Sequence, residues 1–317
     1  MLTYDFIKDR PRELLAMTGL THEEFTRLIP AFTDAYADLY PPNKTQAGKP
    51  RQRRVGAGAK GALAQITDKL LFILVYQKTQ ALQTLHGLQF GLSQPQANYW
   101  IHRLTAVLQR ALAALGHAPE RDASQVADSP LAVEGAPTLA IDGTERRRQR
   151  PQDPARQKAH YSGKQKAHTD KNLVLVNEVT GQVVYLGPTL PGKTHDKRAA
   201  DEACIAYPPH ATLDKDTGFQ GYEPPGVLTQ QPKKKPKGKA LSPGQRALNR
   251  IFSSARVVVE HAIAGIKRCR IVKEVLRLTK AGISDRVMEI ACGLHNLRVS
   301  CRHPLPTLDL LSLAGSS

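Results

Sequence analysis

Residues 173–186 read LVLVNEVTGQVVYL. Two short apolar runs, 173–177 and 182–186, flank the turn dipeptide Thr180-Gly181. Runs of β-branched residues around a glycine-containing turn predict a β-hairpin. The elements on either side of this hairpin then indicate the fold class.

Short strands and helices alternate around the hairpin. A strand is predicted over 138–142, a helix over 196–205, two strands over 211–213 and 227–230, and a long helix over 242–269. The order strand, hairpin, helix, strand, strand, helix predicts an α/β domain of the RNase H-like type, with a mixed sheet flanked by helices.

The N-terminal part of the chain has helical periodicity only. Apolar residues recur at helical spacing over 1–40, with Thr21 as a predicted N-cap. Three further helices are predicted over 68–77, 81–88 and 95–115. Their spacing favours a helix-turn-helix domain, and a plain three-helix bundle is the alternative. In a helix-turn-helix, the start of the last helix reads DNA bases, and the predicted contacts here are Gln94, Gln96, Asn98, Tyr99 and Arg103.

Five segments follow from these patterns. They are N-terminal helices with a basic linker at 1–61, the helix-turn-helix at 62–116, a linker rich in Ala, Pro, Asp and Ser at 117–136, the catalytic domain at 137–303 and a tail at 304–317.

Composition points to a polyanionic partner. The chain has 317 residues, with 45 Lys and Arg against 28 Asp and Glu, so its formal charge is +17. Nucleic acid is the partner that such a charge favours. The four cysteines have no metal-ligand spacing and are predicted to be reduced thiols. No leader and no apolar run of membrane-spanning length is found, so a cytoplasmic, nucleoid-associated bacterial protein without membrane contact is predicted.

Three carboxylates stand at positions that a folded sheet would bring together. Asp142 closes the first predicted strand, Asp216 follows the fourth, and Glu260 lies on the long helix. Hard oxygen ligands of this kind suit Mg²⁺, and two ions about 3.5–4 Å apart support phosphoryl chemistry. Each acid alone would more simply be a turn former, a helix cap or half of a surface ion pair.

Local motifs around these acids occur in a defined order. They are IDGTE at 141–145, HYSGK at 160–164, PGKTHDKR at 191–198, DTGFQGY at 216–222 and RVVVEH at 256–261. Together they resemble the insertion-sequence and Harbinger-type branch of the DDE superfamily transposases, over roughly residues 65–300. Gly192-Lys193-Thr194 lacks the first glycine of a Walker motif, so an ATPase is excluded.

The resemblance implies specific roles. Asp142, Asp216 and Glu260 would be the catalytic, metal-binding acids, and Asp214 is a rival for the second place. The implied enzyme is an endonuclease and strand transferase. It would bind terminal inverted repeats, cut DNA ends with two Mg²⁺ or Mn²⁺ ions, and join them to a target as a homodimer or larger assembly. A transposase-derived DNA-binding protein without catalysis and a nuclease without strand transfer are the alternatives.

Basic residues near the acids are predicted to contact DNA. They are Arg146, Arg147, Arg148, Lys164, Lys193 and Arg256, with Lys233, Lys234 and Lys235 from the run KKKPKGK at 233–239. Such side chains contact phosphates and make binding strongly salt dependent.

Overall fold

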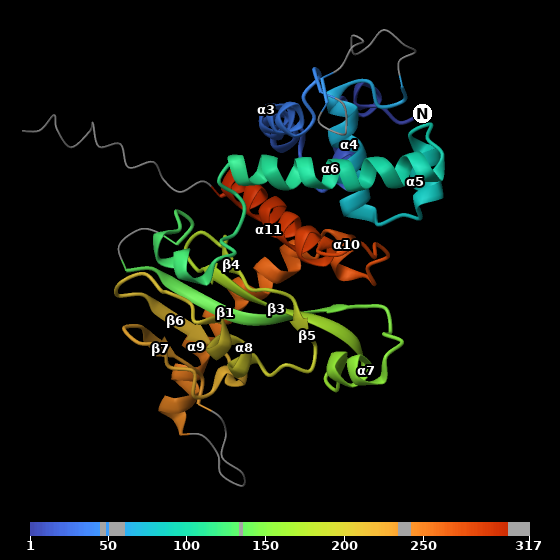
Figure 1. Cartoon of the computed structure of the whole chain (residues 1–317). Helices are drawn as coiled ribbons and strands as arrows, with labels where there is room; N and C mark the ends of the chain where they lie inside the picture. The colour runs from blue at the N-terminus through green and yellow to red at the C-terminus, as the bar shows by residue number, and fades with distance from the viewer. Residues whose placement is uncertain (45–48, 51–60, 133–135, 234–241, 304–317) are drawn as a thin grey trace, which may run out of the picture.

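The computed structural model describes residues 1–44, 49–50, 61–132, 136–233 and 242–303, without the side chains of 246–248 and 250–256. Helices form one end of the molecule and a mixed sheet with its own helices forms the other (Figure 1). The helical elements are α1 (Tyr4–Ile7), α2 (Pro11–Thr18), α3 (His22–Leu39), α4 (Ile66–Thr79), α5 (Gln83–Gln89) and α6 (Gln94–Ala114).

Capping residues define where two of these helices begin. The Thr21 hydroxyl accepts a hydrogen bond from the Glu24 amide, and the Glu24 carboxylate accepts one from the Thr21 amide, which confirms the predicted cap of α3. Ser93 and Gln96 form the equivalent capping box at the start of α6. The central helix α4 is buried all round from Leu70 to Gln77, because its sequence is almost entirely apolar.

The sheet is built around two long strands, β1 (Thr138–Arg147) and β3 (Ala167–Asn177). The other strands are β2 (Tyr161–Ser162), β4 (Val183–Leu186), β5 (Leu190–Pro191), β6 (Thr212–Lys215) and β7 (Leu228–Gln230). The order across the sheet is β2-β3-β1-β6-β7, with β4 and β5 also paired to β3. β1, β6 and β7 are parallel, whereas β3 is antiparallel to β1 and to β4. This order and these directions fit an RNase H-like domain.

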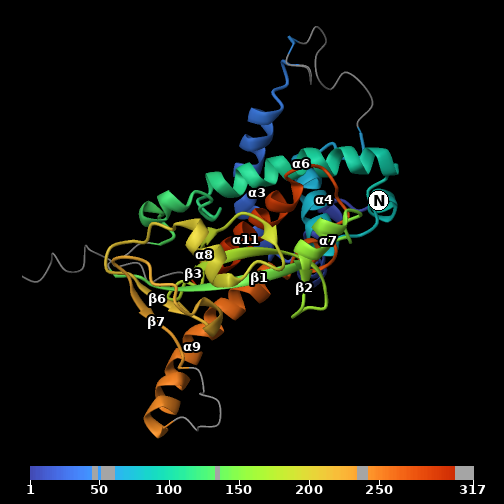
Figure 2. The same ribbon diagram turned by 60° about the horizontal axis from the view of Figure 1, so that its bottom comes forward.

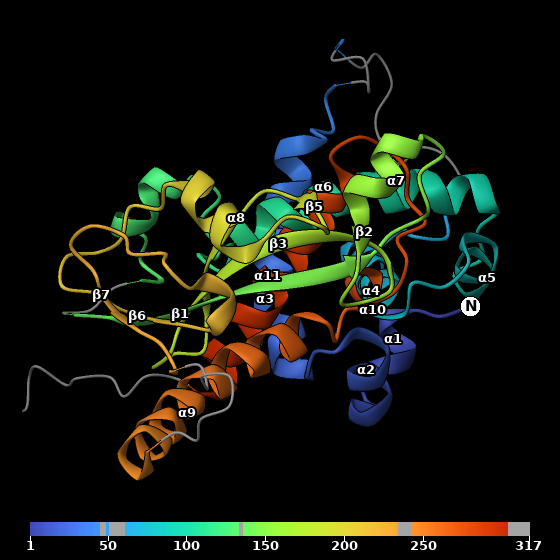
Figure 3. The same ribbon diagram turned by 90° about the horizontal axis from the view of Figure 1, so that it is seen from below.

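Helices cover both faces of the sheet (Figures 2 and 3). On one face, Ala140, Val174 and Val176 share a core with α9 (Pro243–Ile266), α10 (Arg270–Lys273) and α11 (Ile283–Arg302). On the other face, Leu139 and Ile141 pack with α8 (Asp196–Ala203) and the 3₁₀ turns η1 (Ala123–Asp128) and η2 (Thr217–Phe219). The remaining helix, α7 (Pro154–His160), follows β1 and precedes β2 along the chain.

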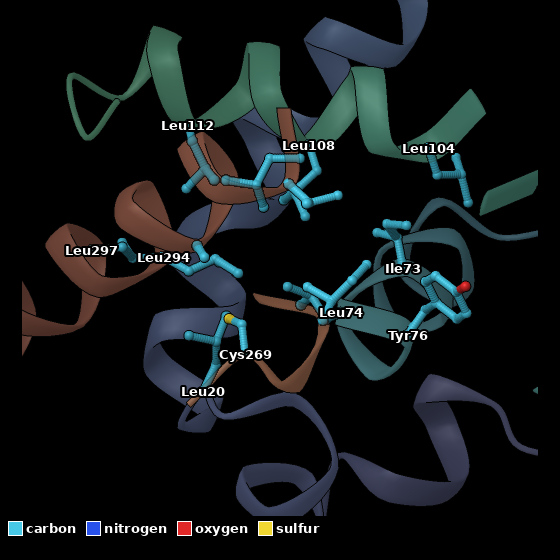
Figure 4. Close-up of a cluster of buried hydrophobic side chains, with 14 of the residues drawn as sticks. Leu20, Ile73, Leu74, Tyr76, Leu104, Leu108, Leu112, Cys269, Leu294 and Leu297 are labelled. Carbon is cyan, nitrogen blue, oxygen red and sulfur yellow. The ribbon is translucent and has the colours of Figure 1, made fainter. Parts of the chain in front are cut away.

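The core on the α9 and α11 face continues into the N-terminal helices. Figure 4 shows Leu20, Leu74 and Leu108 of the N-terminal helical region meeting Cys269 and Leu294 of the C-terminal region. Because α11 lies between the N-terminal helices and the sheet, it joins the two parts (Figure 1).

The segment predicted as an interdomain linker is attached to the sheet. Glu120 donates its backbone amide to Val184 and accepts the Leu186 amide, so this segment lies along β4. Asn296 of α11 exchanges hydrogen bonds with both backbone groups of Val183 and also donates to His117 O.

The predicted order of elements is confirmed. The hairpin turns at Gly181, whose φ of 69° is the left-handed conformation that glycine favours. β1 and β3 run further than predicted because both continue into polar residues that pair with each other, such as Arg146 with Asp170. The sequence interpretation did not include α7, α10 or α11.

Candidate active site

Two of the predicted acids extend from neighbouring parallel strands. The last pair in the β1–β6 register is Ile141 with Lys215, so Asp142 and Asp216 follow at the same end of the sheet. Asp142 Oδ1 accepts a hydrogen bond from the Gly143 amide at 2.7 Å, and Asp216 Oδ1 accepts one from the Gly218 amide at 2.6 Å. These backbone contacts orient both carboxylates.

Helix α9 brings the third acid to the same place. Val259 and Ile266 are on the buried side of α9, whereas Glu260 lies on its exposed flank. One pocket is lined by Ala140, Ile141, Asp142, Asp214, Lys215, Asp216, Val259 and Glu260. In the described part of the chain, no three His, Cys, Asp or Glu side chains are grouped tightly enough to hold a metal ion.

The pocket is electrostatically unfavourable for Asp142. Burial, together with the nearby Asp216 and Asp196, raises the pKa of its carboxyl to about 6, against the opposing effects of the Gly143 hydrogen bond and Lys164. Carboxylates that repel one another and offer hard oxygens fit a divalent cation, because its charge would offset the repulsion.

A fourth acid, Asp196 of α8, lies close to these carboxylates. Its Oδ1 pairs with the Lys171 ammonium at 2.7 Å, and Lys171 also donates to Thr194 O. A Cβ placed on Gly143 would lie 2.5 Å from Asp196 Oδ1, and one on Gly218 would lie 3.0 Å from Asp196 Oδ2. The glycines of the first and fourth motifs therefore leave room for the aspartate of the third. In the sequence, Asp196 stood out only as part of the PGKTHDKR motif.

Asp214, the rival for the second acid, stands opposite Ala140 in the register, two residues before Asp216. It is buried, and its carboxyl lies beside that of Glu178. Burial and the neighbouring Asp214 raise the pKa of Glu178 to about 8, and burial also raises the pKa of Asp214. Asp214 thus lines the pocket but has a carboxyl partner of its own.

Comparison with known proteins agrees with this arrangement. Residues 141–296 match the DDE superfamily endonuclease family, a span that contains all three predicted acids. These residues form a DDE superfamily endonuclease domain. The chain is also 25% identical over 291 residues to the probable transposase for insertion sequence element IS702 of Microchaete diplosiphon, covering 92% of this chain and 96% of that protein. No solved structure gives a significant match. The resemblance seen in the motifs is therefore confirmed.

The basic residues around the DDE domain's pocket differ in accessibility. Arg146 is only 5% exposed and donates to Asn172, Thr189 and the Ser284 carbonyl. Its guanidinium is engaged inside the fold, and the sequence did not show this because all three partners are distant in the chain.

The neighbours of Arg146 lie nearer to solvent. Arg148 pairs with Asp170 at 2.8 Å beside His160, whereas the side chains of Arg147, Lys164 and Lys193 are exposed. Lys233 is exposed as well. Lys234, Lys235 and the Arg256 side chain lie outside the described residues.

The predicted base-reading residues precede the DDE domain at the start of α6. Gln96 completes the cap of α6, and Gln94 and Asn98 are both hydrogen bonded to Gln83 of α5. The Arg103 guanidinium lies 3.3 Å from the ring centroid of Tyr40.

Arg103 also donates to the Tyr99 hydroxyl. It is therefore held by aromatic rings.

Among the described helices, none is long and apolar enough to cross a bilayer.

Proposed function

We propose that this chain is a DNA transposase in which Asp142, Asp216 and Glu260 are the catalytic acids. The observation that carries the proposal is the parallel register that sets Asp142 beside Asp216, with Glu260 of α9 lining the same pocket. The DDE superfamily endonuclease match over these residues supports it.

The three acids would hold two Mg²⁺ or Mn²⁺ ions. When bound, such ions activate the attacking oxygen and stabilise the leaving oxygen of the phosphodiester. The Gly143 and Gly218 amides hold one oxygen of Asp142 and of Asp216, leaving the other oxygens to face a ligand. Glu260 lies on an exposed flank of α9 and lines the same pocket as the strand acids.

DNA would lie across the exposed basic side chains near the pocket. Arg147, Lys164, Lys193 and Lys233 fit this role by their exposure, and Lys234, Lys235 and Arg256 are proposed with them from sequence. Arg148 would contribute beside its ion pair with Asp170. Arg146 is left out because its guanidinium is buried.

Helices α4, α5 and α6 would act as the helix-turn-helix that recognises terminal inverted repeats. Gln94, Asn98 and Tyr99 at the start of α6 would face bases, after Gln94 and Asn98 exchange Gln83 for DNA. Cleavage and joining of two DNA ends would require a homodimer or larger assembly on DNA.

Incubating purified protein with Mg²⁺ and DNA that carries the element's ends tests this function. Nicked ends and joined products are expected from the wild type. D142N, D216N and E260Q should each lose cleavage while retaining DNA affinity, and D214N should retain cleavage. Hydrolysis without joined products would identify a nuclease, and binding without cleavage by the wild type would identify a non-catalytic DNA-binding protein. Cleavage by D142N would refute the assignment.

A further inference from the structure

A second cavity lies on the other side of α9 from the catalytic pocket. Its volume is about 640 Å³, and it is enclosed by α9, α11 and the turn between β3 and β4. Gly265 forms part of the floor, where a Cβ would lie 2.3 Å from His295 Nδ1. His295 is held there by a contact of 2.9 Å between its Nε2 and Gly181 O. The groove therefore depends on close packing of two helices and a hairpin turn.

Positive charge dominates the lining of this groove. Arginine and histidine are supplied by two helices and the segments that follow them, as His261, Arg268, His295, Arg298, Arg302 and His303. The acid among the lining residues is Glu178, whose carboxyl lies beside that of Asp214.

Not all of these basic side chains are available to a ligand. Arg302 pairs with Glu24 at 2.6 Å, and Arg298 is buried and donates to Gly265 O at 2.7 Å. His261, Arg268 and His303 are exposed. These three side chains can reach an anion in the groove.

The arginines of this cluster affect two other basic groups. Burial, together with Arg298, Arg268 and Arg270, lowers the pKa of Lys78 on α4. Burial, Arg298 and Arg268 likewise lower the pKa of His295 to about 4, against its Gly181 hydrogen bond. Mutual repulsion in such a cluster would be relieved by a bound polyanion.

The groove and the catalytic pocket flank the same helix. Val259 and Glu260 line the pocket, whereas Val258, His261 and Ala262 line the groove. At the sheet end, Glu178 of the groove contacts Asp214 of the pocket. Helix α9 packs against both α11 and β1 (Figure 3). A strand at the pocket would therefore pass over one turn of α9 to enter the groove.

We propose that this groove binds the sugar-phosphate backbone of the DNA that enters the catalytic pocket, through His261, Arg268 and His303. The proposal rests on the proposed function, because DNA is the polyanion that the pocket would receive. No Phe, Tyr or Trp is among the described residues that line the groove, so bases have no ring to stack on. The contact is therefore to phosphates and independent of base sequence.

The test compares DNA binding by full-length H261A/R268A with that of R12A, whose substitution removes an exposed arginine from α2. Anisotropy of labelled duplex, measured in EDTA over a salt series, gives the affinity and its salt dependence. The double variant should bind about 5–50-fold more weakly with a salt slope smaller by about 1–2, and R12A should match the wild type. R268K should keep most of the affinity, because lysine keeps the positive charge. This result would not be expected if Arg268 had only a structural role.

Several outcomes would overturn the groove assignment. An unchanged salt slope in H261A/R268A would do so, and so would an equal loss in R12A. Loss of self-association with undiminished DNA affinity would assign the groove to a second copy of the chain and reject DNA. Cleavage is not measured in this test, so a wild type that binds but does not cut would remove the proposed activity and leave the groove result intact.

Discussion

Replacing Asp142 by Asn is expected to stabilise the metal-free protein while abolishing its metal-dependent activity. The Asp142 carboxyl is half-buried and lies near Asp216 and Asp196, and its pKa is raised from 3.8 to about 6. Ionised Asp142 therefore opposes folding at neutral pH. Asn keeps a side-chain oxygen for the Gly143 amide but carries no charge, so the repulsion disappears.

The magnitude follows from the pKa shift. One pKa unit corresponds to about 1.4 kcal/mol, so the shift amounts to about 3 kcal/mol as an upper bound. Partial solvent contact of the side chain reduces this, and about 1–3 kcal/mol at pH 7 is expected. Because the folded pKa lies above the unfolded one, the protonated carboxyl's stabilising effect is complete below pH 3.8 and is lost as the pH rises through about 6. The advantage of D142N should therefore shrink as the pH falls from 7 to 4.

Urea unfolding in EDTA, followed at several pH values, measures this difference. D142N should have the higher midpoint at pH 7, with an unchanged dependence on urea concentration. Adding Mg²⁺ should stabilise the wild type and not D142N. D34N, which changes an exposed aspartate on α3, is the matched control and should show no pH-dependent gain. A D142N protein that is no more stable than the wild type at pH 7, or whose advantage does not vary with pH, would refute the electrostatic reasoning.

Two further pairs of variants test the packing around the site. G143A should lose about 1–3 kcal/mol of stability and most cleavage, because its Cβ would meet Asp196 Oδ1 at 2.5 Å. G163A has no atom within 4 Å of its Cβ, so it should behave like the wild type in unfolding and cleavage assays. Equal stability of the two alanine variants would contradict the close approach of Asp196 to Gly143. R146A should lower the free energy of unfolding by about 2–4 kcal/mol, because it leaves buried acceptors unpaired. R147A should instead change stability by less than about 0.5 kcal/mol and weaken DNA binding, so an unstable R147A or an undisturbed R146A would count against this division.

Local sequence was enough to predict many of the helices and strands of the chain. Alternating apolar runs, the Thr180-Gly181 turn and the Thr21 cap are short-range signals, and the structure has a hairpin and a helix start at those places. The ordered motifs also placed Asp142 at the strand and Glu260 on the helix that line one pocket. Such features depend on residues within a few positions of one another, which is why the sequence alone determined them.

Tertiary structure decided which groups share a space. The register of β1 and β6 sets Asp216, rather than Asp214, next in line beside Asp142, and no local pattern specifies a pairing across about 70 residues. The same holds for Asp196, which reaches Gly143 and Gly218 from another element, and for Arg146, whose hydrogen-bond partners are scattered along the chain. Burial and charge are properties of the assembled fold, so only the folded chain shows that Arg146 is a buried arginine of the core and that Asp142 is held among like charges.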